Sequence, residues 1–198
     1  HELKYNTDYQ FGPFSLELVS LTHSIPDPAA LVLRTDAGNI LHTGDWKFDE
    51  TPTLGNDTDR ARLKEIGDEG IMALVGDSTN AMVEGRTPSE AVAQKGLTEA
   101  IAEAKHAVAV TLFASNVARI KSIIAAAQAN GRSVCVAGRA LTRTISAAKE
   151  VGYLKDIPDF VPETEANLIP RENLVIICTG SQGETRAAMA RIANGTHE

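Results

Sequence analysis

The sequence predicts an α/β fold in two parts, of which the first is mostly β and the second alternates strands with helices. Over about the first 45 residues, apolar residues alternate with polar ones or form short runs, which is typical of strands. Beyond residue 88, short apolar runs alternate with helical patterns, which indicates βαβ crossovers and a parallel sheet. The charge balance changes there too: residues 1–88 contain 7 Lys and Arg against 15 Asp and Glu, whereas residues 89–198 contain 12 against 11. We therefore place a domain boundary after residue 88.

The first part is expected to hold four strands and one short helix. Apolar residues at positions 14, 16, 18 and 21 indicate a half-buried strand. Two further apolar runs are separated by a turn containing Gly38, which predicts a hairpin. Ala61, Leu63 and Ile66 are spaced for a helix within residues 54–70, and the apolar run after it is expected to be a buried strand. The expected strands are residues 14–21, 30–35, 40–43 and 71–75.

The second part is expected to alternate regularly. Thr87-Pro88-Ser89-Glu90 has the pattern of a capping box with proline at the first helical position, so a helix should run from there to about residue 105. Strands are then expected at 107–112, 133–137 and 174–178, and helices at 116–129, 141–151 and 184–193. A polar, proline-bearing stretch over residues 156–171 interrupts the alternation.

Composition excludes several classes of protein. No apolar run approaches the ~20 residues of a membrane span, so we expect no transmembrane helix. No basic segment followed by an apolar core opens the sequence, so we expect no secretory signal in it. Cys135 and Cys178 lie in strand-like runs without CxxC spacing, so we expect buried, reduced thiols in a cytoplasmic protein. The acidic balance argues against a coat protein that binds nucleic acid by charge alone, but it is compatible with an enzyme that holds cations with carboxylates.

Small polar loops follow three of the strands predicted in the second part: residues 113–116, 138–142 and 179–183. Each leads into a helix, so backbone N–H groups and the positive end of a helix dipole should face one crevice. Arg139 and Arg119 could add fixed charge there, because arginine matches phosphate oxygens. Helix caps and tight turns are the alternative interpretation. No Walker or GxGxxG motif is present, so neither an ATPase nor a dinucleotide-binding protein is indicated.

The first part offers candidate metal ligands at strand ends. His23, Asp45 and Asp77 each follow a predicted strand. Imidazole and carboxylate groups bind zinc, and a carboxylate can bridge two ions. Spacing alone leaves open that they are hydrogen-bonded structural residues.

Around these positions, and further along the chain, lie eight short strings. They are Thr22-His23-Ser24-Ile25-Pro26-Asp27, His42-Thr43-Gly44-Asp45-Trp46-Lys47-Phe48-Asp49, Gly76-Asp77-Ser78-Thr79-Asn80, Phe113-Ala114-Ser115-Asn116-Val117, Gly138-Arg139, Gly152-Tyr153-Leu154, Thr179-Gly180-Ser181-Gln182-Gly183-Glu184 and Ala193-Asn194-Gly195-Thr196-His197. Each string is short, but their order and spacing along nearly the whole chain are specific. Together they resemble bacterial ribonuclease J, a family in the β-CASP branch of the metallo-β-lactamase superfamily.

The resemblance implies a fold and an activity. Residues 1–88 would be the C-terminal part of a metallo-β-lactamase αββα half, and residues 89–198 a parallel α/β β-CASP domain that is incomplete at its C-terminal end. The parent protein would be a cytoplasmic ribonuclease holding two Zn²⁺ ions, whose bridging water hydrolyses RNA phosphodiester bonds. The parent protein would act as a 5′→3′ exonuclease. Some members of the family also act as endonucleases. Its partners would be 5′-monophosphorylated RNA and further copies of itself, with no membrane.

The resemblance also assigns roles to residues. His23 and Asp45 match metal ligands, and Asp77 matches the catalytic acidic motif of the β-CASP branch. His42 is expected to orient the metal site from outside the ligand set. Five residues are expected to line the RNA-facing cleft: Ser115, Asn116, Arg139, Ser181 and Gln182.

Departures from the family pattern lead to a further expectation. The HxHxDH string and the later histidine motifs are absent, and Ala118 stands where a histidine is expected. We therefore expect the isolated polypeptide to be an inactive segment that does not hold two zinc ions tightly. Two alternatives remain open: a non-catalytic β-CASP-like module that binds RNA or a nucleotide, and a metallo-β-lactamase-fold hydrolase of another ester. Finding the HxHxDH string in the parent sequence would favour the enzyme over the binding module. A comparison of 5′-phosphorylated RNA with lactam or thioester substrates would test the hydrolase.

Overall fold

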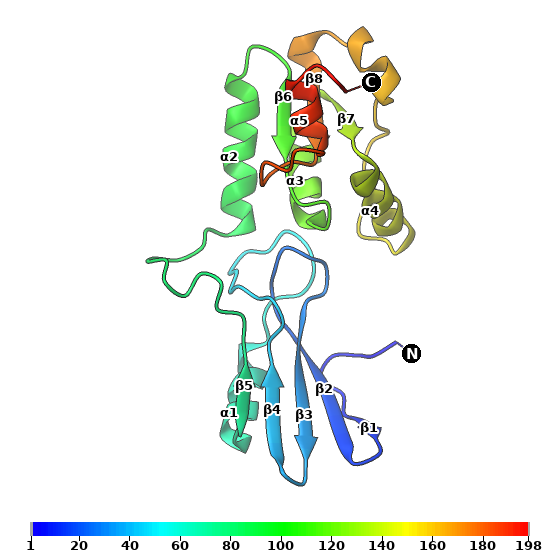
Figure 1. Cartoon of the computed structure of the whole chain (residues 1–198). Coiled ribbons are helices and arrows are strands. Elements are labelled where there is room, and N and C mark those ends of the chain that lie inside the picture. The colour runs from blue at the N-terminus through cyan, green and yellow to red at the C-terminus, as the bar shows by residue number, and fades with distance from the viewer. Residues whose placement is uncertain (1, 198) are drawn as a thin grey trace. The chain divides into compact units, whose positions relative to one another are not determined.

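The computed structural model describes residues 2–197, which fall into two compact units that divide after Ser89. Unit 1 (residues 1–89) contains a five-stranded sheet, and unit 2 (residues 90–198) contains a three-stranded sheet (Figure 1). None of the described helices is long and apolar enough to cross a membrane.

Unit 1 is a mixed sheet with the strands in sequence order. The first three pairings are antiparallel, and β4 and β5 are parallel, with helix α1 (Arg60–Glu69) in the connection between them. The predicted hairpin is present as β3 and β4, joined by a turn in which Gly38 has φ +139°. The strands are β1 (Tyr9–Phe11), β2 (Phe14–Ser20), β3 (Ala29–Thr35), β4 (Gly38–His42) and β5 (Ala73–Val75).

The core of unit 1 lies between this sheet and α1. Val19 of β2 pairs with Ala30 of β3, and both are fully buried with Val32 and with Ile66 of the helix. Ile66 was predicted to lie on the apolar helix face. Asp59 caps α1 by accepting a hydrogen bond from the Arg62 amide at 2.9 Å, which satisfies one of the free N–H groups at the helix start.

The prediction of a buried strand at residues 71–75 is wrong in one respect. A strand is present as β5, but Met72, Leu74 and Val75 are 62%, 67% and 49% exposed. The physical reason is that β5 is the edge of the sheet and pairs only with β4, so a continuous apolar run does not guarantee cover on both faces.

Unit 2 has a parallel sheet, as the βαβ alternation predicts. Its strand order is β6-β8-β7. Its strands are β6 (Val108–Thr111), β7 (Ser133–Ala137) and β8 (Leu174–Cys178). Its α-helices are α2 (Glu90–Glu103), α3 (Val117–Ala129), α4 (Arg139–Glu150) and α5 (Ala188–Ala193). Two 3₁₀ helices, η1 (Glu163–Leu168) and η2 (Arg171–Asn173), lie in the polar stretch before β8.

Helices cover both faces of the central strand β8. Cys178 packs with Ala137 of β7 and Ala188 of α5, and it is fully buried. Val175 and Ile177 point to the opposite face, because side chains alternate along a strand, and both are fully buried. Cys135 and Cys178 are buried free thiols, as predicted. Burial raises the pKa of Cys178 to about 11, so this thiol stays protonated at neutral pH.

Three helix starts differ from the sequence prediction. Helix α2 begins at Glu90, two residues after the proline that was predicted at its first position. Helix α4 begins at Arg139, two residues early, because Gly138 adopts φ +120° and serves as its N-cap. Helix α5 begins at Ala188, four residues late. Thr179 accounts for the late start, because its hydroxyl accepts from the Ala188 amide at 3.3 Å and its carbonyl from the Met189 amide at 3.0 Å.

Candidate functional site

Unit 1 gathers polar groups at one edge of its sheet. Asp45 follows β4 and Asp77 follows β5, and these two strands are parallel neighbours, so their carboxyl ends share an edge. Thr22 bridges to Lys47, which brings the segment of His23 beside the segment of Asp45. The three candidate residues of the first part thus come from adjacent segments.

The carboxylate of Asp77 is held by its own loop. Its Oδ1 accepts from the Thr79 amide at 2.8 Å and from the Thr79 hydroxyl at 2.5 Å. These hydrogen bonds lower the pKa of Asp77, and the Trp46 amide and the charge of His23 lower it further. Asp77 therefore stays ionised, and it lies within electrostatic reach of His23.

The other polar groups at this edge make local contacts. His23 Nδ1 lies 3.3 Å from the Ser24 hydroxyl, and Asp45 is exposed. His42 Nδ1 accepts from the Gly44 amide at 3.0 Å, which fixes this ring against its own loop. The orienting role predicted for His42 stays a prediction.

The donor set at this edge does not fit a complete metal centre. Among residues 2–197 no group of three or more His, Cys, Asp and Glu side chains is placed to hold an ion. His23 and Asp45 are two candidate ligands, whereas a catalytic zinc site uses three protein ligands and a structural one uses four. We therefore assign no catalytic step to a metal held by these residues alone.

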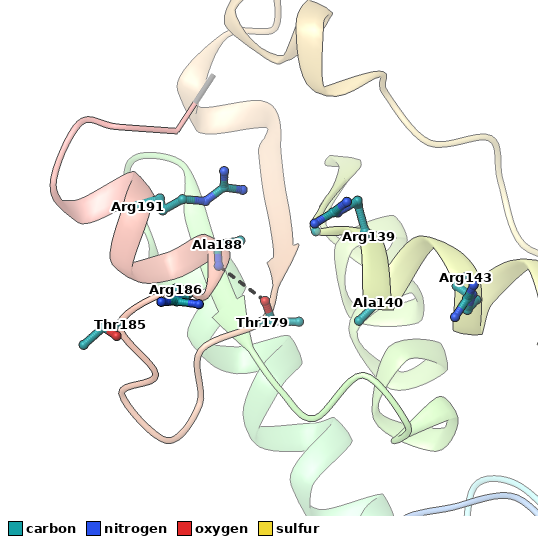
Figure 2. Close-up of a pocket in the computed structure, with 9 residues that line it drawn as sticks. Arg139, Ala140, Arg143, Thr179, Thr185, Arg186, Ala188 and Arg191 are labelled. Atoms are coloured by element: carbon teal, nitrogen blue, oxygen red, sulfur yellow. Dashed lines mark hydrogen bonds between the residues drawn. The ribbon is translucent and has the colours of Figure 1, made fainter.

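Unit 2 contains a cleft of about 910 Å³ that is lined by four arginines, which we call the arginine cleft. Figure 2 shows Arg139 and Arg143 on one side of Thr179, and Arg186 and Arg191 on the other. None of the four forms a salt bridge with an acidic side chain of the described residues. The complete lining is Gly138, Arg139, Ala140, Arg143, Thr179, Thr185, Arg186, Ala188 and Arg191.

Two loops at the carboxyl ends of β7 and β8 build this cleft. Arg139 and Arg143 lie one turn apart on α4, directly after Gly138. The loop after β8 turns back at Gly180, where φ is +124° and an added Cβ would come within 2.9 Å of the Met189 Cβ. Only glycine fits this close approach, which lets the loop carry Arg186 and α5 carry Arg191 to the cleft.

One carboxylate lies at the rim of the cleft. The Glu163 Oε1 atom accepts a hydrogen bond from the Gly138 amide at 3.1 Å. A backbone N–H at the start of a helix is a binding group for phosphate oxygens, so Glu163 occupies a donor that an anionic ligand would use. Removing this charge should strengthen anion binding.

Glu163→Gln is expected to increase the affinity of the cleft for a phosphate anion by roughly 3- to 10-fold, because it removes a negative charge from the rim while keeping the side chain's size. Calorimetric titration of the chain with inorganic tripolyphosphate measures this. Glu165→Gln, in the same 3₁₀ helix, is the matched control. An unchanged or weaker affinity of the Glu163 variant would contradict the prediction.

Of the five residues that were predicted to line an RNA-facing cleft, one lines the arginine cleft and four do not. Arg139 lines the arginine cleft, whereas Ser115, Ser181 and Gln182 are on neighbouring loops outside its lining. The Asn116 Oδ1 atom caps α3 by accepting from the Arg119 amide at 2.9 Å.

Arg119 does not add charge to the cleft. Its guanidinium binds the buried carboxylate of Glu90, with nitrogen–oxygen distances of 2.5 and 3.1 Å, and ties α3 to α2. Sequence reasoning missed Arg143, Arg186 and Arg191. The spacing of Arg139 and Arg143, four residues apart on one helix, was the available signal for the first of these.

The parallel sheet of unit 2 and the cleft at the carboxyl ends of its strands point to a known type of domain. Residues 105–198 match the family model described as "Ribonuclease J, beta-CASP domain". The fold is also similar to a crystal structure of a protein of unknown function from Enterococcus faecalis V583, with a TM-score of 0.61 and 17% identity over 88% of this chain and 44% of that one. Residues 105–198 of unit 2 therefore match a β-CASP domain.

Curated relatives place the chain more narrowly. It is 50% identical to "Ribonuclease J" of Sinorhizobium meliloti over 182 residues, covering 92% of this chain and 32% of that protein. It is 39% identical to "Ribonuclease J 1" of Streptococcus pyogenes over 199 residues, covering 100% of this chain and 35% of that protein. The chain belongs to the ribonuclease J family, as its strings predict, and it spans about a third of the length of these relatives.

Proposed function

We propose that the chain is part of a metal-dependent ribonuclease in which the arginine cleft of unit 2 holds the RNA backbone. The observation that carries this proposal is the set of four arginines without acidic partners among the described residues. Arginine binds phosphate oxygens through paired N–H groups, so four arginines in one cleft provide a binding surface for a phosphate backbone.

We propose that unit 1 is the C-terminal part of a metallo-β-lactamase half and brings His23 and Asp45 to the metal ions. Asp77 would be the acidic group beside them, already ionised and fixed by Thr79. Because two ligands do not complete a zinc site, the remaining ligands would come from the rest of the whole protein. Bound zinc would supply an ionised water near neutral pH.

For the 198-residue chain alone, we propose RNA binding without cleavage. This proposal is supported by the number of candidate ligands: His23 and Asp45 are two, whereas a catalytic zinc site uses three, and no group of three or more is found among residues 2–197. It is tested by measuring binding and hydrolysis of 5′-monophosphorylated RNA by this chain, with zinc titration by calorimetry alongside. Tight binding of two zinc ions, or hydrolysis of RNA by the chain alone, would contradict it. A homo-oligomeric whole protein remains a prediction that sedimentation would test.

Asp45→Asn in the whole protein is expected to lower RNA hydrolysis by at least about 100-fold, because an amide is a weaker ligand than a carboxylate and carries no charge to hold a cation. Asp45 is exposed in a loop after β4, so the change should leave the free energy of unfolding within about 0.5 kcal/mol of the unchanged protein. Turnover and urea unfolding check the two parts. Asp36→Asn, in the loop of the β3–β4 hairpin, is the control. Turnover by Asp45→Asn close to that of Asp36→Asn would contradict the proposed role of Asp45 as a metal ligand.

A further inference from the structure

Unit 1 contains a concavity of its own, which shares no lining residue with the arginine cleft of unit 2. It has a volume of about 710 Å³ and lies beside Asp77. Trp46 and Phe48 line it together with Arg60 and Arg86. We call it the aromatic pocket.

The aromatic pocket combines two aromatic rings with a guanidinium group. The rings of Trp46 and Phe48 meet edge to face, with centroids 4.8 Å apart and planes at 65°. The Arg60 guanidinium carbon lies 4.3 Å from the Phe48 ring centroid, on the ring face. Glu50 accepts from Arg60 Nη2 at 2.5 Å, which steadies the guanidinium in this position.

This stack is open to a ligand. Phe48 is 43% exposed and the Arg60 side chain is 54% exposed, so burial in the core does not account for their arrangement. A guanidinium plane or an aromatic ring with an uncovered face is a surface on which a nucleobase stacks, with a gain of about 1–3 kcal/mol per base.

The pocket also supplies a cation. Arg86 lines it and forms no salt bridge with an acidic side chain of the described residues. Ser78 and Asn80 add hydrogen-bonding groups to the wall next to Asp77. A simple anion would not need an aromatic surface, and an apolar ligand would not need a free guanidinium. A nucleotide needs both.

We propose that the aromatic pocket binds one nucleotide, with its base on the stack of Phe48 and Arg60 and its phosphate toward Arg86. The proposal rests on the proposed function only in taking RNA as the source of that nucleotide. A free mononucleotide has the same chemistry, so binding can be measured without RNA and without metal.

Trp46 makes the test direct, because it is the only tryptophan of the chain and its ring lies in the pocket. Titration of the 198-residue chain with AMP is expected to quench its fluorescence to saturation. Ribose 5-phosphate, which lacks the base, is expected to bind at least about 10-fold more weakly, given the worth of one stacked base. Equal binding of the two ligands, or no quenching by AMP, would overturn the proposal.

Two variants separate stacking from charge. Arg60→Lys keeps the charge but removes the plane, and Arg86→Gln removes the charge. Each is expected to weaken AMP binding by roughly 5- to 20-fold, and Arg171→Gln in unit 2 is the matched control. Far-UV circular dichroism checks that each variant is folded. AMP binding that Arg60→Lys and Arg86→Gln leave unchanged would overturn the proposal.

Source and site are distinguished by two further measurements. A short oligoribonucleotide should quench Trp46 as AMP does, and its quenching should fall with Arg60→Lys. Quenching by AMP but not by the oligoribonucleotide would overturn RNA as the source.

Arg143→Gln, in the arginine cleft, should lower RNA affinity but not AMP quenching. If it abolishes AMP quenching instead, the nucleotide site belongs to the arginine cleft and the inference fails while the proposed function stands. If cleft variants leave RNA affinity unchanged while AMP quenching persists, the proposed function fails and the inference stands.

Discussion

Replacing Arg62 with alanine is expected to destabilise unit 1 by about 3 kcal/mol, because it breaks a buried, bidentate ion pair. Arg62 donates from Nε and Nη2 to the two carboxylate oxygens of Glu17, at 2.6 and 2.8 Å. The Glu17 side chain is only 2% exposed, in the middle of β2. Arg34 remains 2.7 Å from the same carboxylate, which keeps the cost at the lower end for a broken buried pair.

A control in the same helix separates this effect from loss of a surface charge. Lys64 pairs with Asp68 at 2.7 Å, but both side chains are at least 70% exposed. Lys64→Ala should therefore cost less than about 0.5 kcal/mol. Urea unfolding followed by Trp46 fluorescence reports unit 1 specifically, since that unit holds the only tryptophan. Equal costs for the two variants would contradict the assignment.

The ion pairs of Glu17 and Glu69 with Arg34 and Arg62 predict that unit 1 becomes less stable at low pH. Hydrogen bonds from Arg62, and also from Arg34, lower the pKa of Glu17, and Arg34 lowers the pKa of Glu69. A carboxylate whose pKa is lower in the folded state stabilises the fold above the unfolded value of ~4.3, and this contribution is lost as the pH falls through the folded pKa. Unit 1 should lose stability below about pH 4, and Arg62→Ala should reduce that pH dependence.

The burial of Glu17 shows where pattern reasoning stops. Alternation in residues 14–21 correctly predicts a strand, but it suggests that positions 14, 16 and 18 face the core. In the structure Phe14 is 44% exposed, whereas Glu17 lies on the face that packs against α1, with Val19 and Leu21. The Glu17 carboxylate can be buried on that face because Arg34 and Arg62, from distant segments, form ion pairs with it. No local sequence pattern contains this information.

In the candidate site, too, some residues could be predicted from the sequence and others could not. Arg139 was predictable because it follows a strand in a parallel sheet, where ligand sites gather at carboxyl ends. Arg186 and Arg191 were not, because their position depends on the loop that Gly180 folds back and on the late start of α5 at Ala188. Asn116 looked like a cleft residue for the same strand-end reason, yet its side-chain oxygen caps α3.

The double substitution Arg139→Gln and Arg191→Gln is expected to weaken binding of single-stranded RNA by roughly 10- to 100-fold, since each guanidinium–phosphate contact is worth about 1.5–3 kcal/mol before solvent screening. Both side chains line the arginine cleft, from opposite sides of Thr179 (Figure 2). Affinity measured between low and moderate salt should also show a smaller slope against the logarithm of salt concentration, by about 0.7 for each phosphate that the variant no longer neutralises.

Charge alone would weaken binding to some extent wherever an arginine is removed, so the position of the substituted arginine matters. Arg171→Gln removes one positive charge, as each cleft substitution does, but at the amino end of β8, away from the cleft at the carboxyl end. It should leave the salt slope unchanged and lower affinity by less than about 2-fold, because an exposed charge more than a Debye length from a ligand is largely screened. If Arg171→Gln shifts the slope as much as a single cleft substitution does, the RNA is held by diffuse attraction to unit 2, and the arginine cleft has no special role.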